Sequence, residues 1–408
     1  MTRWPNDMSR LVARSIGTGT QKPTAARRNL EYWTNDFATL YHADAREIPL
    51  PDRSVHCVVT SPPYYNLRRY DTDLSNVIGN ESSPEEYLKS MLDVFREVKR
   101  VLRDDGICWV NLGDSYAVGA KGGIQTQEDD NSTNWYRRNR GQRTQHDEVG
   151  IAHGNMIGIP WRFAFAMQSD GWTLRDAVIW AKSAPMPESV NGTRWEQCRI
   201  KTALSPAPTT QGHRPGDGID EWVGGSMGNG NHRSEWMDCP GCEKCNANDG
   251  LVLRKGSWRS TASYEFIYQF TKGMGYYADG EAVKTDTDAN RRNVWKDINA
   301  ENYNGEHYAT FPPDLPRICI QASTSEAGVC SECGDQWARV MTGGFRPSCD
   351  CNGGKIPATV LDPFNGSGTT LIAAQRLGRR GVGVDISTEY LAQSIKRISR
   401  ETLPMMIH

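Results

Sequence analysis

The sequence lacks a long hydrophobic run. Its 408 residues are 38% hydrophobic and 24% charged, and no stretch approaches the roughly 18 consecutive apolar residues that a transmembrane helix needs. The N-terminus also lacks the apolar core of a secretion signal, so we expect a cytoplasmic protein without membrane contact. The length suits one large globular domain with insertions, or two domains.

A surplus of charge of either sign is also missing. The chain has 47 Lys and Arg residues against 49 Asp and Glu residues, for a net charge of −2. Its overall field therefore does not attract a polyanion, and any contact with a nucleic acid must come from local basic patches. Residues 1–36 are polar and are expected to form an N-terminal arm.

Cysteine, by contrast, is plentiful, with 11 residues. Without a secretion signal these residues are expected in a reducing compartment, where closely spaced cysteines favour metal binding over disulfides. A structural zinc ion would order the insertion at 328–356, which is too short to build its own core. The alternative is free, reduced cysteine. The four thiolates that would bind this zinc are Cys330, Cys333, Cys349 and Cys351.

A second cysteine group has two overlapping Cys-x-x-Cys steps, formed by Cys239, Cys242 and Cys245. This spacing is typical of a zinc knuckle, but it supplies only three local ligands. The fourth could be His232, Cys198 or a remote residue, and the spacing leaves this choice open.

The stretch from Thr60 to Tyr64 follows an apolar run, Val55 to Val59, that predicts a buried strand. Pro62 and Pro63 have no backbone N–H and a fixed φ, so the chain leaves the strand in one rigid shape. Ser61 and the Pro62 carbonyl can accept hydrogen bonds from a planar amino group, and Tyr64 offers a stacking face worth about 1–3 kcal/mol. The alternative is a plain strand end with a Pro-Pro turn.

A second strand, from Thr359, leads into a glycine-rich turn and then a helix from Leu371. Gly366 and Gly368 permit positive φ and the close approach of a ligand. No Lys follows the second glycine, which disfavours a phosphate loop of the Walker type. Asp385 ends the next strand about 20 residues later, the spacing at which an acid binds ribose hydroxyls in Rossmann-like units.

Together, Ser-Pro-Pro-Tyr at 61–64 and Asp-Pro-Phe-x-Gly-Ser-Gly-Thr-Thr at 362–370 resemble the β (permuted) group of amino-methylating DNA methyltransferases. The resemblance covers residues 37–115, 155–190, 260–325 and 357–400. It implies an α/β, Rossmann-like fold with a mostly parallel sheet and a circularly permuted motif order. It also implies S-adenosylmethionine as cofactor, double-stranded DNA as partner and, in a restriction-modification system, a cognate restriction endonuclease.

The resemblance also divides the chain. The expected parts are a catalytic half at 37–190, a target-recognition insertion at 191–258, a return to the core at 259–327, the cysteine-rich insertion at 328–356 and a cofactor-binding half at 357–408. The segment at 113–150 contains a basic run with interleaved aromatics, from Trp135 to Arg143. It is expected to be either a mobile loop that closes on DNA or a surface insertion.

Site residues follow from the matched motifs. The catalytic residues implied are Ser61, Pro62, Pro63 and Tyr64. Asp44 would contact the adenine part of the cofactor, and Asp385 its ribose. The other cofactor-binding residues implied are Thr60, Thr310, Phe311, Pro312, Asp362, Pro363, Phe364, Gly366, Ser367, Gly368, Thr369 and Thr370.

Local signals predict the elements that carry these motifs. Ser83 at N-cap, Pro84 at N1 and Glu86 at N3 predict a helix that continues to Leu102. A strand at 107–112 follows it, which gives the order expected of an α/β fold. Further elements are predicted as a helix at 159–168, strands at 177–180 and 264–270, and a last helix capped by Ser387.

The motifs indicate the reaction more clearly than they indicate which base is methylated. Relatives with Ser at the first motif position mostly act on cytosine N4, and those with Asp or Asn mostly act on adenine N6, so Ser61 favours cytosine-N4 methylation with adenine N6 as the alternative. The Pro-Pro motif contains no Cys, which disfavours methylation at carbon. A catalytically silent, zinc-stabilised DNA-binding protein and an RNA methyltransferase are lower alternatives. The oligomeric state and the recognition sequence stay open.

Overall fold

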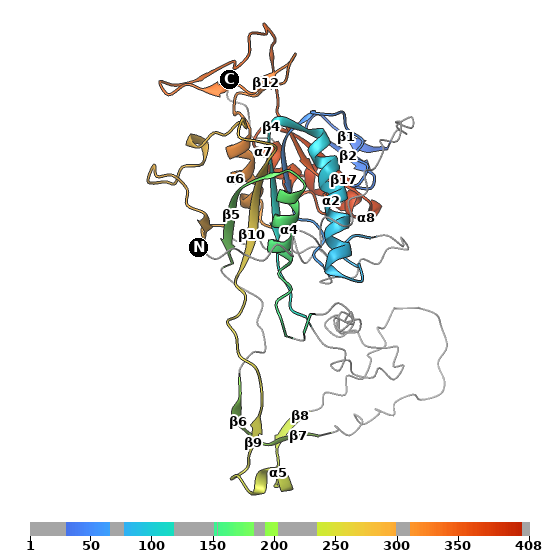
Figure 1. Ribbon diagram of the computed structural model, residues 1–408, viewed down its shortest axis with the longest axis vertical. Helices are drawn as coiled ribbons and strands as arrows, with labels where there is room; N and C mark the ends of the chain where they lie inside the picture. Colours follow the sequence, from blue (N-terminus) through green and yellow to red (C-terminus); the bar gives the residue numbers. More distant parts are fainter. Residues whose placement is uncertain are drawn as a thin grey trace, which may run out of the picture. The chain divides into compact units, whose positions relative to one another are not determined.

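The computed structural model describes residues 30–65, 77–117, 151–152, 154–182, 192–202, 235–298 and 311–401 (Figure 1). The chain divides into two compact units. We call Met1–Ser183 with Tyr264–His408 the core unit, and Ala184–Ser263 the inserted unit. Predictions that fall outside the described residues are Thr310 as a cofactor residue, His232 as a metal ligand, the basic run of the 113–150 segment, and residues 1–29 of the expected N-terminal arm.

A nine-stranded mixed sheet forms the centre of the core unit, in the order β1-β2-β17-β16-β3-β4-β10-β5-β11. The strands from β2 to β4 in this order pair in parallel, whereas β10 runs antiparallel between β4 and β5. The α/β class with a mostly parallel sheet is therefore confirmed. The strands are β1 (Glu31–Thr34), β2 (Ala38–His42), β3 (Val55–Thr60), β4 (Leu102–Leu112), β5 (Thr173–Ala181), β10 (Tyr264–Thr271), β11 (Val294–Trp295), β16 (Thr359–Asp362) and β17 (Arg380–Asp385).

Helices cover both faces of this sheet, as Figure 1 shows. They are α2 (Pro84–Val101), α4 (Ile159–Ser169), α6 (Asp314–Ser323), α7 (Thr369–Arg376) and α8 (Thr388–Ile398), with a short 3-10 helix, η3 (Glu281–Val283). Ser83 accepts a hydrogen bond from the Glu86 N–H at the start of α2, and Ser387 accepts one from the Tyr390 N–H at the start of α8. Both N-caps are thus confirmed.

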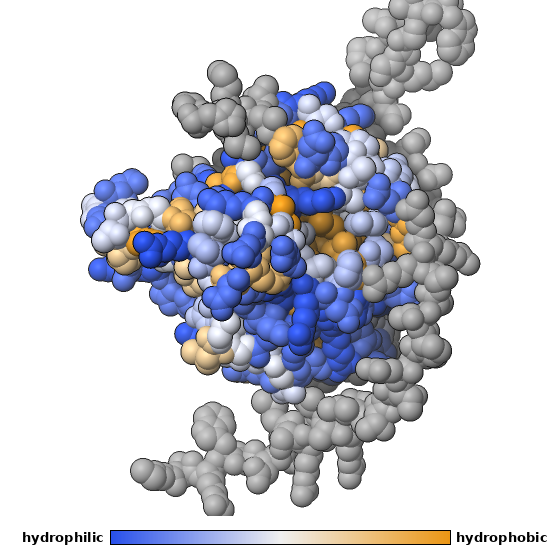
Figure 2. Space-filling model, turned by 90° about the horizontal axis from the view of Figure 1, so that it is seen from above, coloured by the Kyte–Doolittle hydropathy of each residue, from blue (hydrophilic) through white to orange (hydrophobic). Residues whose placement is uncertain are grey.

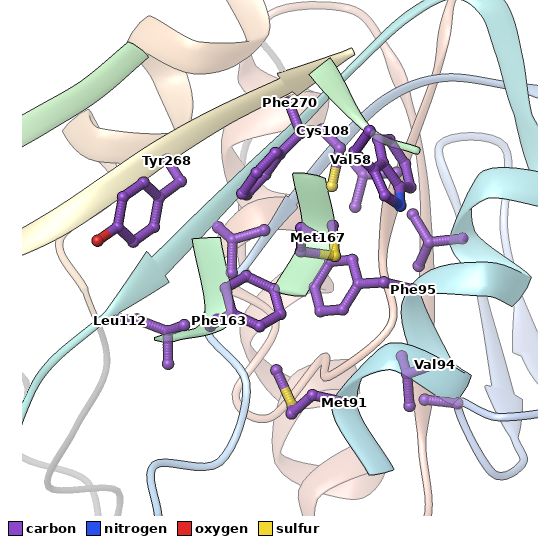
Figure 3. Packing of buried hydrophobic residues seen from close by; sticks show 14 of the residues in the cluster. Val58, Met91, Val94, Phe95, Cys108, Leu112, Phe163, Met167, Tyr268 and Phe270 are labelled. Carbon is purple, nitrogen blue, oxygen red and sulfur yellow. The ribbon is translucent and has the colours of Figure 1, made fainter. Parts of the chain in front are cut away.

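Side chains alternate between the two faces along the central strands. In β3, Val58 packs with α2 and α4, whereas its neighbours Cys57 and Val59 pack with α6 and α7. Figure 3 shows the first of these two layers, in which the rings of Phe95 and Phe163 meet edge to face at 5.1 Å between centroids. This period of two is what a strand buried on both faces requires.

Several boundaries differ from those predicted, among them β5, which begins at Thr173 rather than at 177. β1 lies inside the expected arm at 1–36, because Glu31–Thr34 pair with β2 along the sheet edge. β4 begins at Leu102, immediately after α2, rather than at 107. Pairing with β3 shifts register between Leu102 and Ile107. The polar residues of this bulge carry no strand pattern, so sequence periodicity could not detect them.

The inserted unit contains two small antiparallel sheets. β6 (Arg194–Gln197) pairs with β9 (Leu251–Arg254), and β7 (Arg199–Thr202) pairs with β8 (Glu235–Asp238). One short helix, α5 (Glu243–Asn246), follows β8. None of the three clusters of buried hydrophobic residues found in the described chain includes a residue of this unit.

The cysteine-rich insertion belongs to the core unit. Its strands are β12 (Val329–Cys330), β13 (Ala338–Arg339), β14 (Phe345–Arg346) and β15 (Lys355–Ile356), which pair as β12 with β15 and β13 with β14. Arg103 of β4 donates to the Cys333 carbonyl and to Asp335, and the ring of His56 hydrogen bonds to the Gly334 carbonyl. The insertion is therefore attached directly to the central strands.

Hydrophilic residues predominate on the face of the molecule in Figure 2, where apolar residues form separate small patches. Among the described residues, no helix combines the length and apolar character needed to cross a membrane.

Candidate active site

The two signature motifs lie side by side although about three hundred residues separate them in the chain. β3 and β16 are adjacent parallel strands, with Val360 opposite Cys57 and Leu361 opposite Val58. From β16 the chain continues to β17 on one side, and from β3 it continues to β4 on the other. Such a switch point, at the carboxyl ends of parallel strands, is where open α/β sheets bind ligands.

Asp362 joins the two strand ends. Its carboxylate accepts hydrogen bonds from the Thr60 hydroxyl at 2.7 Å, the Thr370 hydroxyl at 2.8 Å and the Phe364 N–H at 3.1 Å. Burial raises the pKa of Asp362 to about 6, although the Thr60 and Thr370 hydrogen bonds act to lower it. The side chains of Asp362, Thr60 and Thr370 are 3% exposed or less. Their hydrogen bonds therefore connect the ends of β3 and β16 to α7 within the protein interior.

The Pro-Pro segment is fixed by the core helix beside it. The hydroxyl of Tyr87 in α2 donates to the Pro63 carbonyl at 2.8 Å. No donor from the described part of the chain is found at the Pro62 carbonyl. The Pro62 carbonyl oxygen therefore remains available as a hydrogen-bond acceptor next to the Ser61 hydroxyl.

Tyr64 is anchored through its hydroxyl. It donates to Glu265 at 2.7 Å and lies 3.1 Å from the Asn111 side-chain oxygen, while the Ser61 hydroxyl approaches it at 3.5 Å. Burial, and then the negative charge of Glu265, raise the pKa of Tyr64 well above its ordinary value. The phenol therefore stays protonated, and the hydrogen bonds set the orientation of the ring.

Glu265 also pairs with Lys182, so a chain of contacts runs from Lys182 through Glu265 to Tyr64. The two residues sit at the ends of β5 and β10, which pair antiparallel there. A Cβ at Gly113 would lie 2.8 Å from the Tyr64 ring, so a larger residue would displace it. Sequence reasoning missed Asn111, Gly113, Lys182 and Glu265 as site residues. For Lys182 and Glu265 the available signal was a charged residue at the end of a predicted strand, whereas the uncharged Asn111 and Gly113 carried no such signal.

The glycine-rich turn connects β16 to α7. Gly368 is the N-cap of α7 with φ of 79°, and a Cβ there would collide with the Ser394 hydroxyl. Arg397 of α8 donates to the Ser367 hydroxyl at 2.7 Å and to the Thr369 hydroxyl at 3.0 Å. These two side chains thus face α8, and the turn is left with its backbone to offer a ligand.

Asp385 supports the same turn from β17. Its two oxygens accept the Gly366 N–H at 2.8 Å and the Ser387 N–H at 2.9 Å, and burial raises its pKa to about 6. The Ile386 N–H also stabilises the charged form of this carboxylate, and two carboxylate oxygens together offer about four acceptor positions. The carboxylate can therefore support the turn and still accept a hydroxyl.

The remaining residues that were predicted to bind the cofactor lie in different parts of the core unit. Asp44 pairs with Arg46 at 2.6 Å; burial alone would raise its pKa, but the guanidinium lowers it. Phe311 is buried in the hydrophobic cluster with α6 and α7, and Pro312 begins the turn into α6. Pro363 is buried, and Phe364 is partly buried against the layer of α2 and α4.

Both cysteine groups form compact clusters. The Sγ atoms of Cys330, Cys333, Cys349 and Cys351 all lie within 4.8 Å of one another. The same holds for Cys239, Cys242 and Cys245 together with Cys198, which is the candidate fourth ligand that the geometry selects. Four thiolates at such distances match a structural zinc site.

A cleft of about 400 Å³ lies elsewhere, against the cysteine-rich insertion. Its charged lining residues pair among themselves, Arg53 with Asp104 and Arg103 with Asp105 and Asp335. Neither signature motif contributes to its lining. The cleft is therefore not the candidate active site.

Comparisons with known proteins agree with this geometry. The family model described as DNA methylase, for N6 and N4 methyltransferases, matches residues 55–396. The chain is 33% identical to the Type II methyltransferase M.Cfr9I of Citrobacter freundii, over 89% of this chain and 88% of that protein. It is 32% identical to the Type II methyltransferase M.SmaI of Serratia marcescens, over 88% and 89%.

Among solved structures, PvuII DNA methyltransferase (cytosine-N4-specific) has a similar fold, with a TM-score of 0.50 and 17% identity, covering 93% of this chain and 90% of that one. The fold, the adjacent motifs and the sequence matches lead to one conclusion. The chain belongs to the DNA methylase family and is an amino-methylating DNA methyltransferase of the restriction-modification type.

Proposed function

We propose that the protein transfers a methyl group from S-adenosylmethionine to the exocyclic N4 of a flipped cytosine in double-stranded DNA. The observation that carries the proposal is the position of Ser61 and Pro62 at the carboxyl end of β3, beside the glycine-rich turn at the end of β16. Ser at the first motif position favours cytosine over adenine. The structural relative named cytosine-N4-specific supports the same choice.

The residues act by binding and orientation. An exocyclic amino group is conjugated with its ring, so its lone pair is a poor nucleophile. Acceptors at the Ser61 hydroxyl and the Pro62 carbonyl would take its two hydrogens, favour a pyramidal nitrogen and stabilise the positive charge that develops on it. The Tyr64 ring, held by Glu265, would stack on the flipped base and offset part of the few kcal/mol that extrusion costs.

The glycine-rich turn and the strand ends around it suit the cofactor. When bound, S-adenosylmethionine supplies a methyl group already activated by a sulfonium. Backbone N–H groups at Gly366–Thr370 would face it, Asp385 would accept its ribose hydroxyls, and Asp44 would accept from its adenine. The Asp385 carboxylate has about four acceptor positions and three backbone N–H partners, so one further donor fits this role.

We assign target recognition to the inserted unit. Trp195, Trp236 and Trp258 are 52%, 58% and 74% exposed there. Exposed aromatic side chains suit contact with bases and sugars, and the adjoining arginines suit phosphate. Two of these arginines, Arg194 and Arg254, form ion pairs with Glu196, so the positive charge of the two side chains is partly balanced in the free protein. A cognate restriction endonuclease is the partner proposed for the modified site.

We also propose a structural zinc ion at Cys330, Cys333, Cys349 and Cys351. Their sulfurs cluster within 4.8 Å, and Cys330 is 2% exposed. The strands around them are only two residues long, so they offer little core to stabilise the insertion. Metal binding would supply that stability.

Nucleoside mass spectrometry of plasmid DNA from expressing cells tests the proposed reaction. We expect N4-methylcytosine with the parent protein and none with Ser61→Ala. N6-methyladenine instead would move the substrate to adenine within the same site. Absence of both modified bases, with the cofactor bound normally, would indicate a silent DNA-binding protein. Persistence of N4-methylcytosine with Ser61→Ala would contradict the role of Ser61.

Asp385→Ala tests the cofactor site separately. Losing hydrogen bonds to a charged group costs about 1.5–3 kcal/mol, so we expect S-adenosylmethionine affinity to fall by about 10- to 100-fold. Isothermal titration calorimetry measures this directly. Ser61→Ala, which lies on the base side of the site, is the control and should bind the cofactor like the parent. Unchanged affinity in Asp385→Ala would remove the ribose role.

A further inference from the structure

The inserted unit has short strands and little buried apolar surface. Its four strands have four residues each, and α5 has four. Apolar side chains that pair across its sheets are exposed: Trp195 opposite Leu253 at 52% and 43%, and Ile200 opposite Met237 at 39% and 49%. Isolated two-stranded sheets are marginally stable in water. Something other than hydrophobic burial must therefore hold the described part of this unit.

The four cysteines of the unit lie where its elements join. Cys198 separates β6 from β7, and Cys239 follows β8, so the β7–β8 pairing brings these two together. The Cys239 N–H donates to the Cys198 carbonyl at 2.8 Å. Cys242 and Cys245 belong to the first turn of α5, which leads to β9. One centre among these cysteines would connect both sheets and the helix.

The sulfur positions match tetrahedral coordination. A tetrahedron with metal–sulfur bonds of about 2.3 Å has edges of about 3.8 Å. The separations here are 3.6 Å for Cys242 to Cys245, 3.9 Å for Cys198 to Cys242 and 4.0 Å for Cys245 to Cys239. A disulfide needs about 2.0 Å, so these thiols are arranged around a common centre rather than in pairs.

The backbone around the cluster also suits a bound cation. The Cys242 N–H donates to the Cys245 sulfur at 3.3 Å, which helps to disperse thiolate charge. Gly241 in the Cys-Pro-Gly-Cys turn has φ of 122°, a conformation that L side chains rarely adopt. Cys245 is 1% exposed and Cys198 is 9% exposed, whereas Cys239 and Cys242 are partly exposed, so the centre is shielded from solvent on the side of Cys198 and Cys245.

We propose that Cys198, Cys239, Cys242 and Cys245 bind one Zn²⁺ and that this ion folds the inserted unit, so that recognition of DNA depends on it and cofactor binding does not. The four ligands and the role of the ion in folding are inferred only from the geometry of the cysteines and the elements around them. The dependence of DNA recognition rests on the proposed function of the inserted unit.

Metal counting by mass spectrometry on Cys198→Ser is the direct test. We expect this variant to bind one zinc ion fewer per chain than the parent. Cys333→Ser, in the other cluster, is the matched control. It should also lose one ion but leave residues 184–263 as resistant to limited proteolysis as in the parent, whereas Cys198→Ser should be cut within them. Cys198→His, which keeps a ligand atom, should retain the ion and the resistance.

Transfer of labelled methyl groups to unmethylated plasmid DNA tests whether DNA recognition depends on the zinc ion. We expect about a tenfold or larger loss in Cys198→Ser, since recognition is coupled to folding of the unit, while calorimetry finds cofactor affinity within about twofold of the parent. Full zinc content and parental protease resistance in Cys198→Ser would overturn the site. Loss of zinc with unchanged transfer would overturn the dependence of recognition on it. A parent protein that methylates no plasmid would instead count against the proposed function, and the zinc counts would still decide the site.

Discussion

At the scale of single residues, the site depends on side chains whose positions are set by others. Tyr64 belongs to the signature motif, yet its ring is oriented by Glu265, and Glu265 is held in turn by Lys182. Glu265 is 13% exposed, so its charge is only weakly screened by water. A residue outside the motif therefore positions a residue inside it.

Replacing Glu265 by Gln should slow methyl transfer by roughly tenfold, because a charge-assisted hydrogen bond to Tyr64 becomes a neutral one. As a positioning residue it should affect kcat, with KM for DNA and for cofactor close to the parental values. Steady-state kinetics on plasmid DNA measure this split. Glu281→Gln makes the same change in the Glu281–Lys284 pair on η3 and should leave kcat unchanged. An unaltered kcat in Glu265→Gln would show that Tyr64 needs no such support.

At the scale of elements, two strands and a helix meet at one carboxylate. Asp362 closes β16, accepts from Thr60 at the end of β3 and accepts from Thr370 in the first turn of α7. It thereby ties the Pro-Pro motif near the amino terminus to the glycine-rich motif near the carboxyl terminus. This buried joint makes the stability of the site dependent on pH.

The sign of that dependence follows from the raised pKa. Asp362 titrates at about 6 when folded, compared with about 3.9 when unfolded. Between about pH 4 and pH 6 the Asp362 carboxyl is protonated in the folded state and ionised in the unfolded state. The stability that this proton contributes is therefore complete below about pH 4 and is lost as the pH rises through 6. The free energy of unfolding of the parent minus that of Asp362→Asn should fall with pH in this window, by up to about 1.4 kcal/mol per pH unit.

Denaturant unfolding of both proteins from pH 4 to pH 8 measures this difference. Loss of bound metal at low pH affects both alike, so the difference isolates Asp362. Asp288→Asn, at a side chain that is 87% exposed, is the control and should give a flat difference. A flat difference for Asp362→Asn as well would contradict the raised pKa.

At the scale of the whole molecule, two insertions interrupt the methyltransferase fold, and each has its own thiol cluster. The cysteine-rich insertion at 328–356 lies in sequence between α6 and β16 and is attached to β3 and β4 through His56 and Arg103. His56 also accepts from the Thr359 N–H, so it contacts the insertion and β16 together. Loss of order in this insertion should therefore weaken the central sheet.

Cys333→Ser should remove one zinc ion and lower the midpoint of thermal unfolding by several degrees, because ligand loss uncouples the insertion from folding. Mass spectrometry and calorimetric scanning measure the two effects. Ser331→Ala, in the same turn but without a thiol, should keep both the ion and the midpoint. An unchanged midpoint after loss of the ion would mean that the insertion adds nothing to the stability of the core.

Sequence alone determined the features that depend on local pattern. Ser83 and Ser387 cap α2 and α8 as predicted. β3 follows an apolar run, β10 an alternating pattern and β17 a short Gly-Val pattern, and none of these needed a partner strand to be recognised. The two signature motifs identified the family for the same reason. Each is a short stretch whose prolines or glycines limit the backbone wherever it occurs.

Only the tertiary structure decided which distant residues meet. Cys198 as fourth thiol, Glu265 beside Tyr64, and Asp114 accepting from the Gly158 and Ile159 N–H groups at the start of α4 all join segments far apart in the chain. Gly158 offers no side-chain cap of its own, so sequence gave no sign of where that cap would come from. Such contacts arise from strand order and register, which no local periodicity encodes, and they set the geometry in which the motifs act.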